Sequence, residues 1–447
     1  MPGRLEFDLN LGPTGRPRDD SEPMRLLVLG DFSGNAAAKR PPLGSRPTLR
    51  VDVDNVNDVM RRLSPRLSVP AGDISFEQID DFHPDRLYAR LEQFQTLRQA
   101  RANPTASSST DDLLGRLLGK PTEPSSARAA APASEIDALI RNVVAPYIVK
   151  DTSAHEKSYV AVVDAAIAEL MRALLHHPAF QSLEAAWRGV HWLISSLELD
   201  ESLQLDLFDV TREELFADII AAQGKLAQTG LYRVLVDRWR NVPGTHGWSA
   251  LVGLIHIGPS DADIGLLAAL GLIASQAGGP ILAGADGALV TVDASALARW
   301  QALRQSQAAP WIGLAAPRVL LRLPYGKSTD PIEAFAFEEF VGEPQHEEFL
   351  WGNAALAVAL LLGRGFSARG WDMEPGDERE IGDLPAYTFV RDGEREMQAC
   401  AERFLTESQI QTLLTAGLIP IASRRDRNAV VAIRFQSISD PPAPLSW

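Results

Sequence analysis

Three residues near the start of the chain have the types that nucleophilic catalysis uses. Ser33 lies in the stretch LLVLGDFSGN, residues 26–35, where four apolar residues lead into Gly30. Asp80 and His83 follow about fifty residues later in the stretch DDFHPD. A serine next to a histidine that an acid orients can attack an ester carbonyl. These residues therefore raise the hypothesis of a hydrolase.

The D-x-x-H-P spacing of Asp80 and His83 resembles that of GDS-type esterases, which remain the alternative hypothesis. Three observations oppose it. Phe32 separates Ser33 from the preceding acid, and the Gly and Asn elements of an oxyanion hole are not found at suitable places. The interval is also too short for several strand-helix units. The sequence instead favours a sharp turn after the strand, in which Gly30 and Gly34 allow the bend and Asp31 or Ser33 caps it.

Other potential binding residues give weaker patterns. His176 and His177 are adjacent, so on a helix their rings diverge by about 100° and cannot face one metal ion. They are more typical of a helix end. His346 has no second histidine four residues on, and PYGKST, residues 324–329, has only one of the two glycines of a phosphate-binding loop. We expect no catalytic residue, no metal and no cofactor.

The composition is that of a globular protein with 45% hydrophobic residues and a net charge of -15. Residues 1–104 carry 15 basic and 15 acidic residues, and residues 105–134 carry three of each, so all the acidic excess lies after residue 134. Such a body repels phosphate backbones, and we expect no nucleic acid partner. No apolar run predicts membrane insertion. The N-terminus does not resemble a secretory signal and Cys400 is the single cysteine, so we expect a cytoplasmic protein.

A segment rich in Pro, Ser, Thr and Ala, residues 103–134, predicts a linker. We therefore expect a first domain over residues 1–104, a flexible linker over 105–134 and a second domain over 135–447. Within the linker, TDDLLGRLLG predicts a short amphipathic helix whose apolar face carries Leu113, Leu114, Leu117 and Leu118. This helix packs on its own domain or docks to a partner.

Periodicity predicts α/β structure in both blocks. In the first block we expect strands at 5–9, 25–29 and 48–53, a helix at 56–63 and a long helix from Pro84 to about Ala102. In the second block we expect helices at 158–175 and from Pro178 to Ile194, and strands at 203–210, 232–237, 250–257 and 279–284. Capping boxes start helices at Thr211 and Thr406, and a hairpin follows at 418–438.

Long strings in the first block resemble the small subunit of the contractile sheath of type VI secretion systems, TssB. They are MRLLVLGDFSG, LRVDVDNVNDVMRRLSPRL and ISFEQIDDFHPDRLYARLEQFQTLRQAR, in family order. In the second block LLHHPAFQSLEAAWRGVHWLI, PRVLLRLPYG, FAFEEF and FLWGNAALAVA resemble the large sheath subunit, TssC. The resemblance implies a contractile-sheath fold with mixed sheets and flanking helices, in two blocks joined by a linker.

The resemblance also implies a function without catalysis. Sheath subunits of this family surround an inner tube and contract to drive it into a target cell, and the expected partners are other sheath subunits, the tube protein, a baseplate and a ClpV-type ATPase that grips a helix like 111–118. The resemblance therefore implies that the chain assembles into a homo- or hetero-oligomer. The family's large subunit continues into a further C-terminal domain, so the resemblance covers a small subunit and the N-terminal part of a large one. A regulatory binding module derived from a sheath is a further alternative.

Several residues of these strings are assigned a structural role by the resemblance: Asp31, Arg322, Tyr325, Glu338, Trp351 and Asn353. Arg322 lies in the otherwise apolar stretch VLLRL, so its charge should be buried only if it is paired. The acids of FEEF, Glu338 and Glu339, are the most plausible partners.

Overall fold

The computed structural model describes residues 19, 21–35, 40–70, 72–102, 155–240, 242, 244–290 and 294–446. The strand expected at residues 5–9 lies outside this range, as does the linker with Leu113, Leu114, Leu117 and Leu118.

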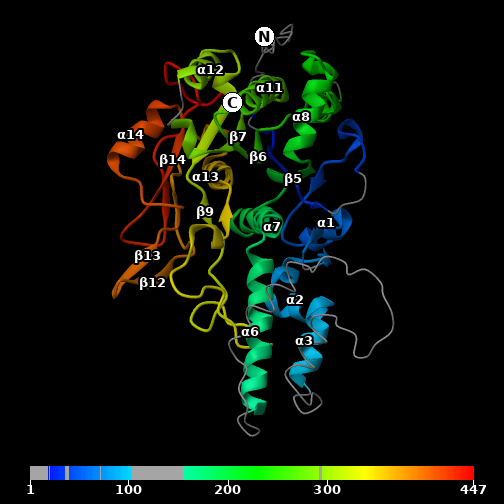
Figure 1. Cartoon of the computed structure of the whole chain (residues 1–447). Coiled ribbons are helices and arrows are strands. Elements are labelled where there is room, and N and C mark those ends of the chain that lie inside the picture. Colours follow the sequence, from blue (N-terminus) through cyan, green and yellow to red (C-terminus); the bar gives the residue numbers. More distant parts are fainter. Residues whose placement is uncertain are drawn as a thin grey trace.

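A nine-stranded mixed sheet forms the centre of the molecule (Figure 1). Its strands lie in the order β11-β15-β14-β8-β7-β6-β1-β5-β2. The strands from β14 to β5 in this order run parallel, whereas the outer pairs at both edges are antiparallel. Their bounds are β1 (Met24–Gly30), β2 (Leu49–Arg50), β5 (Leu203–Asp209), β6 (Ala250–Ile257), β7 (Ile281–Ala285), β8 (Ile312–Ala316), β11 (Glu380–Ile381), β14 (Ile419–Ser423) and β15 (Val430–Ala432). The expected α/β class with a mixed sheet is confirmed.

Strand β1 joins the two blocks of the sequence in one sheet. It lies between β5 and β6, so that Leu27 is paired with Asp206 on one side and with Leu251 on the other. The strand is apolar on both faces because both faces are covered by helices, as is usual for parallel sheets. The first hundred residues therefore contribute β1 and β2 to a sheet that they share with the second block.

Helices cover both faces of the sheet (Figure 1). On one face α7 and α13 pack with the side chains of Leu26 and Val28. On the other, α8 and α11 pack with Leu27 and Leu29. The α-helices are α1 (Val56–Leu63), α2 (Pro84–Arg90), α3 (Gln93–Ala102), α6 (His155–Leu175), α7 (Pro178–Ser196), α8 (Arg212–Ala221), α9 (Gly230–Tyr232), α10 (Arg238–Arg240), α11 (Asp261–Ala277), α12 (Ala294–Arg304), α13 (Ala354–Arg369) and α14 (Glu407–Thr415).

In the described part of the chain, three two-stranded ribbons lie outside the main sheet. They pair β3 (Arg66–Val69) with β4 (Gly72–Ser75), β9 (Val319–Leu320) with β10 (Trp351–Gly352), and β12 (Tyr387–Arg391) with β13 (Glu394–Gln398).

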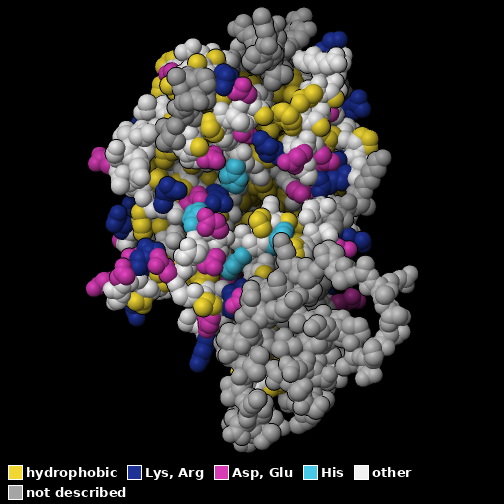
Figure 2. All heavy atoms as spheres, in the orientation of Figure 1, with side chains coloured by type: hydrophobic (Ala, Val, Ile, Leu, Met, Phe, Trp, Pro, Cys, Tyr) yellow, Lys and Arg dark blue, Asp and Glu magenta, His cyan; other side chains and the backbone are white. Residues whose placement is uncertain are grey.

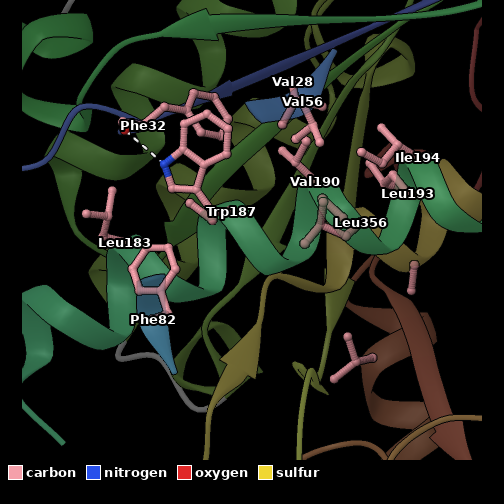
Figure 3. Close-up of a cluster of buried hydrophobic side chains, with 14 of the residues drawn as sticks. Val28, Phe32, Val56, Phe82, Leu183, Trp187, Val190, Leu193, Ile194 and Leu356 are labelled. Atoms are coloured by element: carbon pink, nitrogen blue, oxygen red, sulfur yellow. Dashed lines mark hydrogen bonds between the residues drawn. The ribbon is translucent and has the colours of Figure 1, made fainter. Parts of the chain in front are cut away.

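Trp187 of α7 is central to the core between the two blocks (Figure 3). Its ring is fully buried and meets Phe32 edge to face at 5.4 Å. The indole Nε1 donates a hydrogen bond to the carbonyl oxygen of Phe32 at 3.0 Å, which satisfies the only polar atom of the ring. Nearby, a Cβ at Gly189 would lie 2.5 Å from Leu356, so glycine lets α7 approach α13 closely. These contacts hold the turn after β1 against the second block.

The expected elements agree with the structure where their patterns are strong. The strand at 25–29, the helix at 56–63, the helix from Pro178 and the strand at 250–257 are present, and both capping boxes and the 418–438 hairpin are found.

Three expectations differ from the structure. Residues 232–237 are helical, ending α9 and forming a π-helical turn, so the expected strand is wrong. The long helix from Pro84 is broken because Leu91 has an extended backbone (φ -76°, ψ 135°), which separates α2 from α3. In the stretch 48–53 only Leu49 and Arg50 pair with a neighbouring strand.

Candidate functional site

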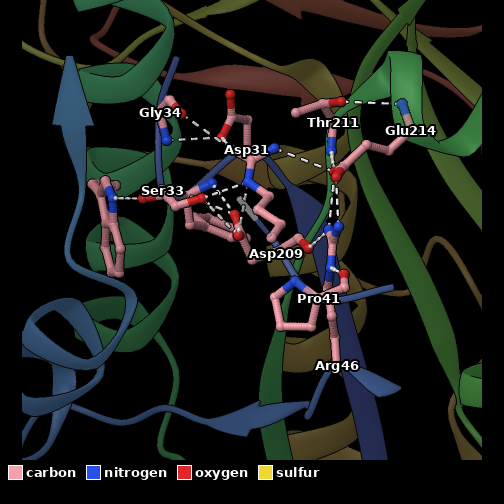
Figure 4. Close-up of polar contacts among 11 residues, drawn as sticks. Asp31, Ser33, Gly34, Pro41, Arg46, Asp209, Thr211 and Glu214 are labelled. Carbon is pink, nitrogen blue, oxygen red and sulfur yellow. Dashed lines mark hydrogen bonds and ion pairs between the residues drawn. The ribbon is translucent and has the colours of Figure 1, made fainter. Parts of the chain in front are cut away.

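Ser33 lies in a buried polar cluster at the turn after β1 (Figure 4). Its hydroxyl donates a hydrogen bond to Asp209 Oδ2 at 2.7 Å and accepts one from Arg40 Nε at 2.8 Å. Asp209, at the end of β5, also accepts the backbone N–H groups of Phe32 and Ser33. The serine is thus held between an acid and a base that lock the turn in place.

His83 and Asp80 make contacts at the start of α2 and not with Ser33. The His83 Nδ1 accepts the backbone N–H of Asp85 at 3.2 Å and so caps α2. The His83 ring meets the Tyr325 ring edge to face at 5.1 Å. The carbonyl oxygen of Asp80 accepts the backbone N–H of His83. The described contacts do not bring Ser33 and His83 together, and nothing in the geometry supports the esterase alternative.

Asp31 and Glu214 are part of the same polar cluster as Ser33 (Figure 4). Asp31 Oδ1 accepts the backbone N–H of Gly34 at 2.9 Å and pairs with Arg40 Nη2 at 2.5 Å. Burial raises the pKa of Asp31 despite this arginine, and the nearby Asp209 adds to the rise. Burial also opposes ionisation of Glu214, but hydrogen bonds from Arg46 and from the backbone N–H of Thr211 outweigh it and lower the pKa of Glu214 to about 2.

Arg322 is buried in a second cluster, which we call the junction cluster: Glu184, Arg188, Arg322, Tyr325 and Glu339. Its Nη1 lies 2.7 Å from Glu339 Oε2 and its Nε lies 2.9 Å from Glu184 Oε1. The guanidinium lies 4.3 Å above the Tyr325 ring. Arg188 pairs with Glu184 at 2.6 Å and donates to the Tyr325 hydroxyl at 2.8 Å. Two arginines and two glutamates therefore balance in charge.

The charge pairing shifts the pKa values of the junction cluster. Burial favours neutral forms, but Glu184 and Glu339 outweigh it and hold the pKa of Arg322 well above its usual value. For Glu339, burial is likewise outweighed by Arg322 and by the nearby His176, and its pKa falls to about 2. Burial raises the pKa of Tyr325 to about 12. The shifts of Arg188, Arg322 and Glu339 all favour the charged form, so the cluster acts as a fixed ionic clamp.

The sequence identified one partner of Arg322 and missed the other. Glu339 is one of the two expected acids, whereas Glu338 accepts the backbone N–H of Lys327 and does not pair with Arg322 in the described contacts. Glu184 is the second partner, and the strings around Arg322 do not indicate it. It lies four residues after Phe180 and three before Trp187, on the apolar face of α7, and an acid at such a position signals a buried ion pair.

The clamp fixes a long irregular segment, residues 321–350, which we call the strap. The strap runs between β9 and β10 and lies against the helices of both blocks. From the first block, Asp85 of α2 accepts the backbone N–H groups of Glu333 and Ala334, and Arg101 of α3 donates to the carbonyl oxygen of Ala334.

From the second block, helices α6 and α7 bind the strap. Arg172 donates to the carbonyl oxygen of Glu338 and Gln181 to that of Glu347, both at 2.8 Å. The strap therefore connects the two blocks through side-chain-to-backbone hydrogen bonds on both sides.

Trp351 and Asn353 follow the strap and also hold elements together. The Trp351 indole donates to the carbonyl oxygen of His346 at 2.9 Å. Asn353 caps α13 by accepting the backbone N–H of Ala355, and it donates to the carbonyl oxygen of Ile255 in β6 at 2.9 Å. These contacts are structural, and their role in assembly stays a prediction.

The histidines do not form a metal site in the described residues, among which no group of three metal-binding side chains was found. His176 follows the end of α6 and lies 3.4 Å from Glu339, whereas His177 caps α7 by accepting the backbone N–H of Ala179. His346 Nε2 lies 3.0 Å from Glu402 Oε1. Across these same residues, helices long and apolar enough to cross a membrane are also lacking.

Two family models match the chain in the order of its two blocks. The model described as "Type VI secretion system, VipA, VC_A0107 or Hcp2" matches residues 3–106. The model described as "EvpB/VC_A0108, tail sheath N-terminal domain" matches residues 157–297 and 291–439. These matches place the α/β fold described above in the class of tail sheath proteins. The chain belongs to the family of type VI secretion tail sheath proteins.

Two curated relatives come from Pseudomonas aeruginosa strain PAO1. The type VI secretion system sheath protein TssC1 is 29% identical over 308 residues, which cover 64% of this chain and 61% of the relative. The type VI secretion system sheath protein TssB1 is 28% identical over 109 residues, which cover 22% of this chain and 62% of the relative. The chain therefore spans about three fifths of the length of each relative.

Proposed function

We propose that the chain is a non-catalytic structural subunit of a type VI secretion contractile sheath, which surrounds an inner tube and contracts to drive it into a target. The observation that supports it best is the shared sheet: β1, from the TssB-like block, lies between β5 and β6 of the TssC-like block. The chain thereby combines in one polypeptide the two kinds of sheath protein that are separate relatives in P. aeruginosa.

The proposed partners are other sheath subunits, the inner tube protein, the baseplate and a ClpV-type ATPase, in the cytoplasm of the secreting cell. A covalent link between the blocks enforces a one-to-one ratio and raises the effective concentration of each block for the other. The ionic clamp and the strap fit a load-bearing subunit, because Asp85 and Arg101 of the first block bind the strap and the clamp fixes the strap to α7 of the second block.

Electron microscopy of the purified chain tests the proposal, with the chain alone and with the tube and sheath proteins encoded beside it. We expect hollow cylinders or rings in at least one of these mixtures, and labelled chain within their walls. A chain that forms no cylinder or ring in any mixture, but binds one sheath protein, would instead indicate the regulatory binding module. A chain that is absent from cylinders formed by its neighbours would contradict the structural role.

A further inference from the structure

A cavity of about 670 Å³ opens at the carboxyl ends of β5, β1 and β6. Asp31 directly after β1, Val210 directly after β5 and residues near the end of β6 line it. The other walls come from the starts of α7, α8 and α13 and from the end of the strap. Figure 2 shows a hollow in this face of the molecule with histidine side chains gathered around it.

The place of the cavity in the sheet is one where ligands bind. The chain passes from β5 to β6, which lie on opposite sides of β1, so the direction of winding changes at this point. In open α/β sheets, ligands bind in the crevice outside the carboxyl ends of the strands at such a switch point. The volume also falls within the range of about 300 to 1,000 Å³ that is usual for small-molecule sites.

Two arginines give the cavity cationic donors, and a histidine lies beside them. Arg212 comes from the first turn of α8, Arg318 from the turn after β8 and His256 from β6. Each arginine contacts an acid through Nη2, Arg212 with Asp263 and Arg318 with Glu402, both at 2.5 Å. A guanidinium has five N–H donors and can bind an oxyanion in addition to such a partner.

The helix starts add to the positive character of the cavity. Helices α7 and α13 carry no acid in their first turns, so their N-terminal dipole charge is not offset there. Of the acids on the wall, Asp31 is bound by Arg40, and Glu213 and Glu347 are exposed side chains that can turn to solvent. Burial and, to a smaller extent, the nearby Arg318 lower the pKa of His256, so its imidazole contributes a neutral polar group to the wall.

An apolar wall lies beside these donors. Phe349 and Trp351, from the strap end and β10, line it together with Leu254 of β6. The two rings are 5.6 Å apart at an angle of 42°, and both are largely buried. Cationic donors next to aromatic side chains suit a ligand that has an anionic group on an apolar or aromatic body. We propose that the cavity binds a small organic phosphate. This inference does not depend on the proposed role in a sheath.

Binding to the full chain can be measured by calorimetry and by the shift of the thermal midpoint, with adenosine monophosphate as the probe. Adenosine and inorganic phosphate, tested separately, distinguish the contribution of the body from that of the anion. We expect saturable binding of the nucleotide below about 1 mM, at least about tenfold tighter than that of either part. Failure of the nucleotide to bind at concentrations up to about 5 mM would overturn the proposal.

Two variants locate the site. Arg212→Gln removes a charge-assisted donor and should weaken binding about tenfold or more. Arg299→Gln is the matched control. Arg299 pairs with Asp261, which lies in the first turn of α11 like Asp263, the partner of Arg212, but Arg299 lies outside the cavity. The Arg299→Gln protein should bind the nucleotide with the affinity of wild type. Ser182→Phe fills the cavity from an exposed position of α7 and should abolish binding. Unchanged affinity in both Arg212→Gln and Ser182→Phe would place the nucleotide elsewhere and overturn the assignment.

Discussion

Among single residues, Arg322 shows how burial fixes a role. Its side chain is enclosed in the junction cluster, and the carboxylates of Glu184 and Glu339 compensate its charge. A guanidinium in an apolar surrounding would otherwise be very unfavourable. The pairing makes the position intolerant of change through its contribution to stability.

Arg322→Ala should therefore lower the free energy of unfolding by about 3 to 5 kcal/mol, because Glu339 loses its buried cationic partner and Glu184 keeps only Arg188. Chemical denaturation with urea measures this loss in the free energy of unfolding. Arg299→Ala removes an arginine from an exposed ion pair and should cost less than about 1 kcal/mol. If the two variants unfold at the same urea concentration, the buried clamp does not stabilise the fold.

Ser33→Ala should lower the free energy of unfolding by about 1 to 3 kcal/mol, because Asp209 loses a buried hydrogen-bond donor. Any ester hydrolysis by the preparation should stay the same. Ser202→Ala is the control, since Ser202 donates to Asp200 over the same 2.7 Å at an exposed site, and its effect should stay within about 0.5 kcal/mol. Loss of hydrolysis in a folded Ser33→Ala protein would restore the esterase hypothesis.

The depressed pKa of Glu339 predicts acid sensitivity. In the folded chain this pKa is about 2 against an ordinary 4.5, so the unfolded state binds more protons between these values. The stabilisation is fully present above about pH 4.5 and is lost as the pH falls toward 2. Glu339→Gln should flatten the decrease in unfolding free energy between pH 5 and pH 2, measured by urea titration at each pH. A variant as acid-sensitive as wild type would assign the effect to other carboxylates, such as Glu214.

The partners of Arg322 also show how far sequence reasoning goes at this scale. Glu339 is 17 residues from Arg322 and was predictable from the neighbouring strings. Glu184 is 138 residues away, and only the three-dimensional fold brings it there. An acid on the apolar face of a helix marks a buried charge without naming its partner.

At the scale of elements, the apolar run YRVLVD was assigned wrongly for a physical reason. A short apolar run rich in β-branched residues is compatible with a buried strand and with a buried helix, and periodicity does not distinguish them. Thr229, whose hydroxyl accepts the backbone N–H of Tyr232, is the capping signal that indicates a helix. Strands β3 and β4 were missed because each has only four residues.

The linker helix expected at residues 111–118 gives a prediction about a partner. Replacing Leu114 and Leu117 with Asp should abolish binding to a ClpV-type ATPase, because the apolar face is lost, and should change the unfolding free energy by less than about 0.5 kcal/mol. Pull-down and thermal melting measure the two effects. Ser107→Asp with Ser108→Asp adds the same charge outside the helix and should leave binding intact. A large loss of stability in the leucine variant would show that the helix packs on its own domain.

For the whole molecule, the shared sheet predicts that neither block folds normally alone. Residues 1–104 and 135–447, produced as two chains, should each be unfolded or aggregated, and should form a soluble complex when produced together. Co-purification of the two fragments measures the formation of this complex. Val28→Asp places a charge in the fully buried β1 and should prevent the complex, whereas Val53→Asp, at a side chain that is 61% exposed, should not. A second fragment that folds alone with the thermal midpoint of the full chain would contradict this expectation.

The shared sheet could not be predicted from the sequence. The reason differs from that for the wrong strand at 232–237 and the unpredicted strands β3 and β4. Residues 103–134 have the composition of a linker, which suggests two separate bodies. Nothing in the apolar pattern of β1 states which strands will lie beside it, because a strand buried on both faces has no polar side to set its place. The resemblance to sheath proteins indicated the family, and the arrangement of β1 between β5 and β6 came from the structure.

The central position of β1 also determines how long this strand stays unpaired during synthesis on the ribosome. Arg25 donates its backbone N–H to Ser249, which is added 224 residues later. At roughly 5 to 20 residues per second, the nascent β1 waits about 10 to 45 seconds for β6. During that time its apolar side chains need a chaperone or a temporary partner. When the two blocks are separate gene products, the waiting time depends on diffusion and on the supply of the other chain, whereas here one messenger RNA delivers both strands in a fixed order.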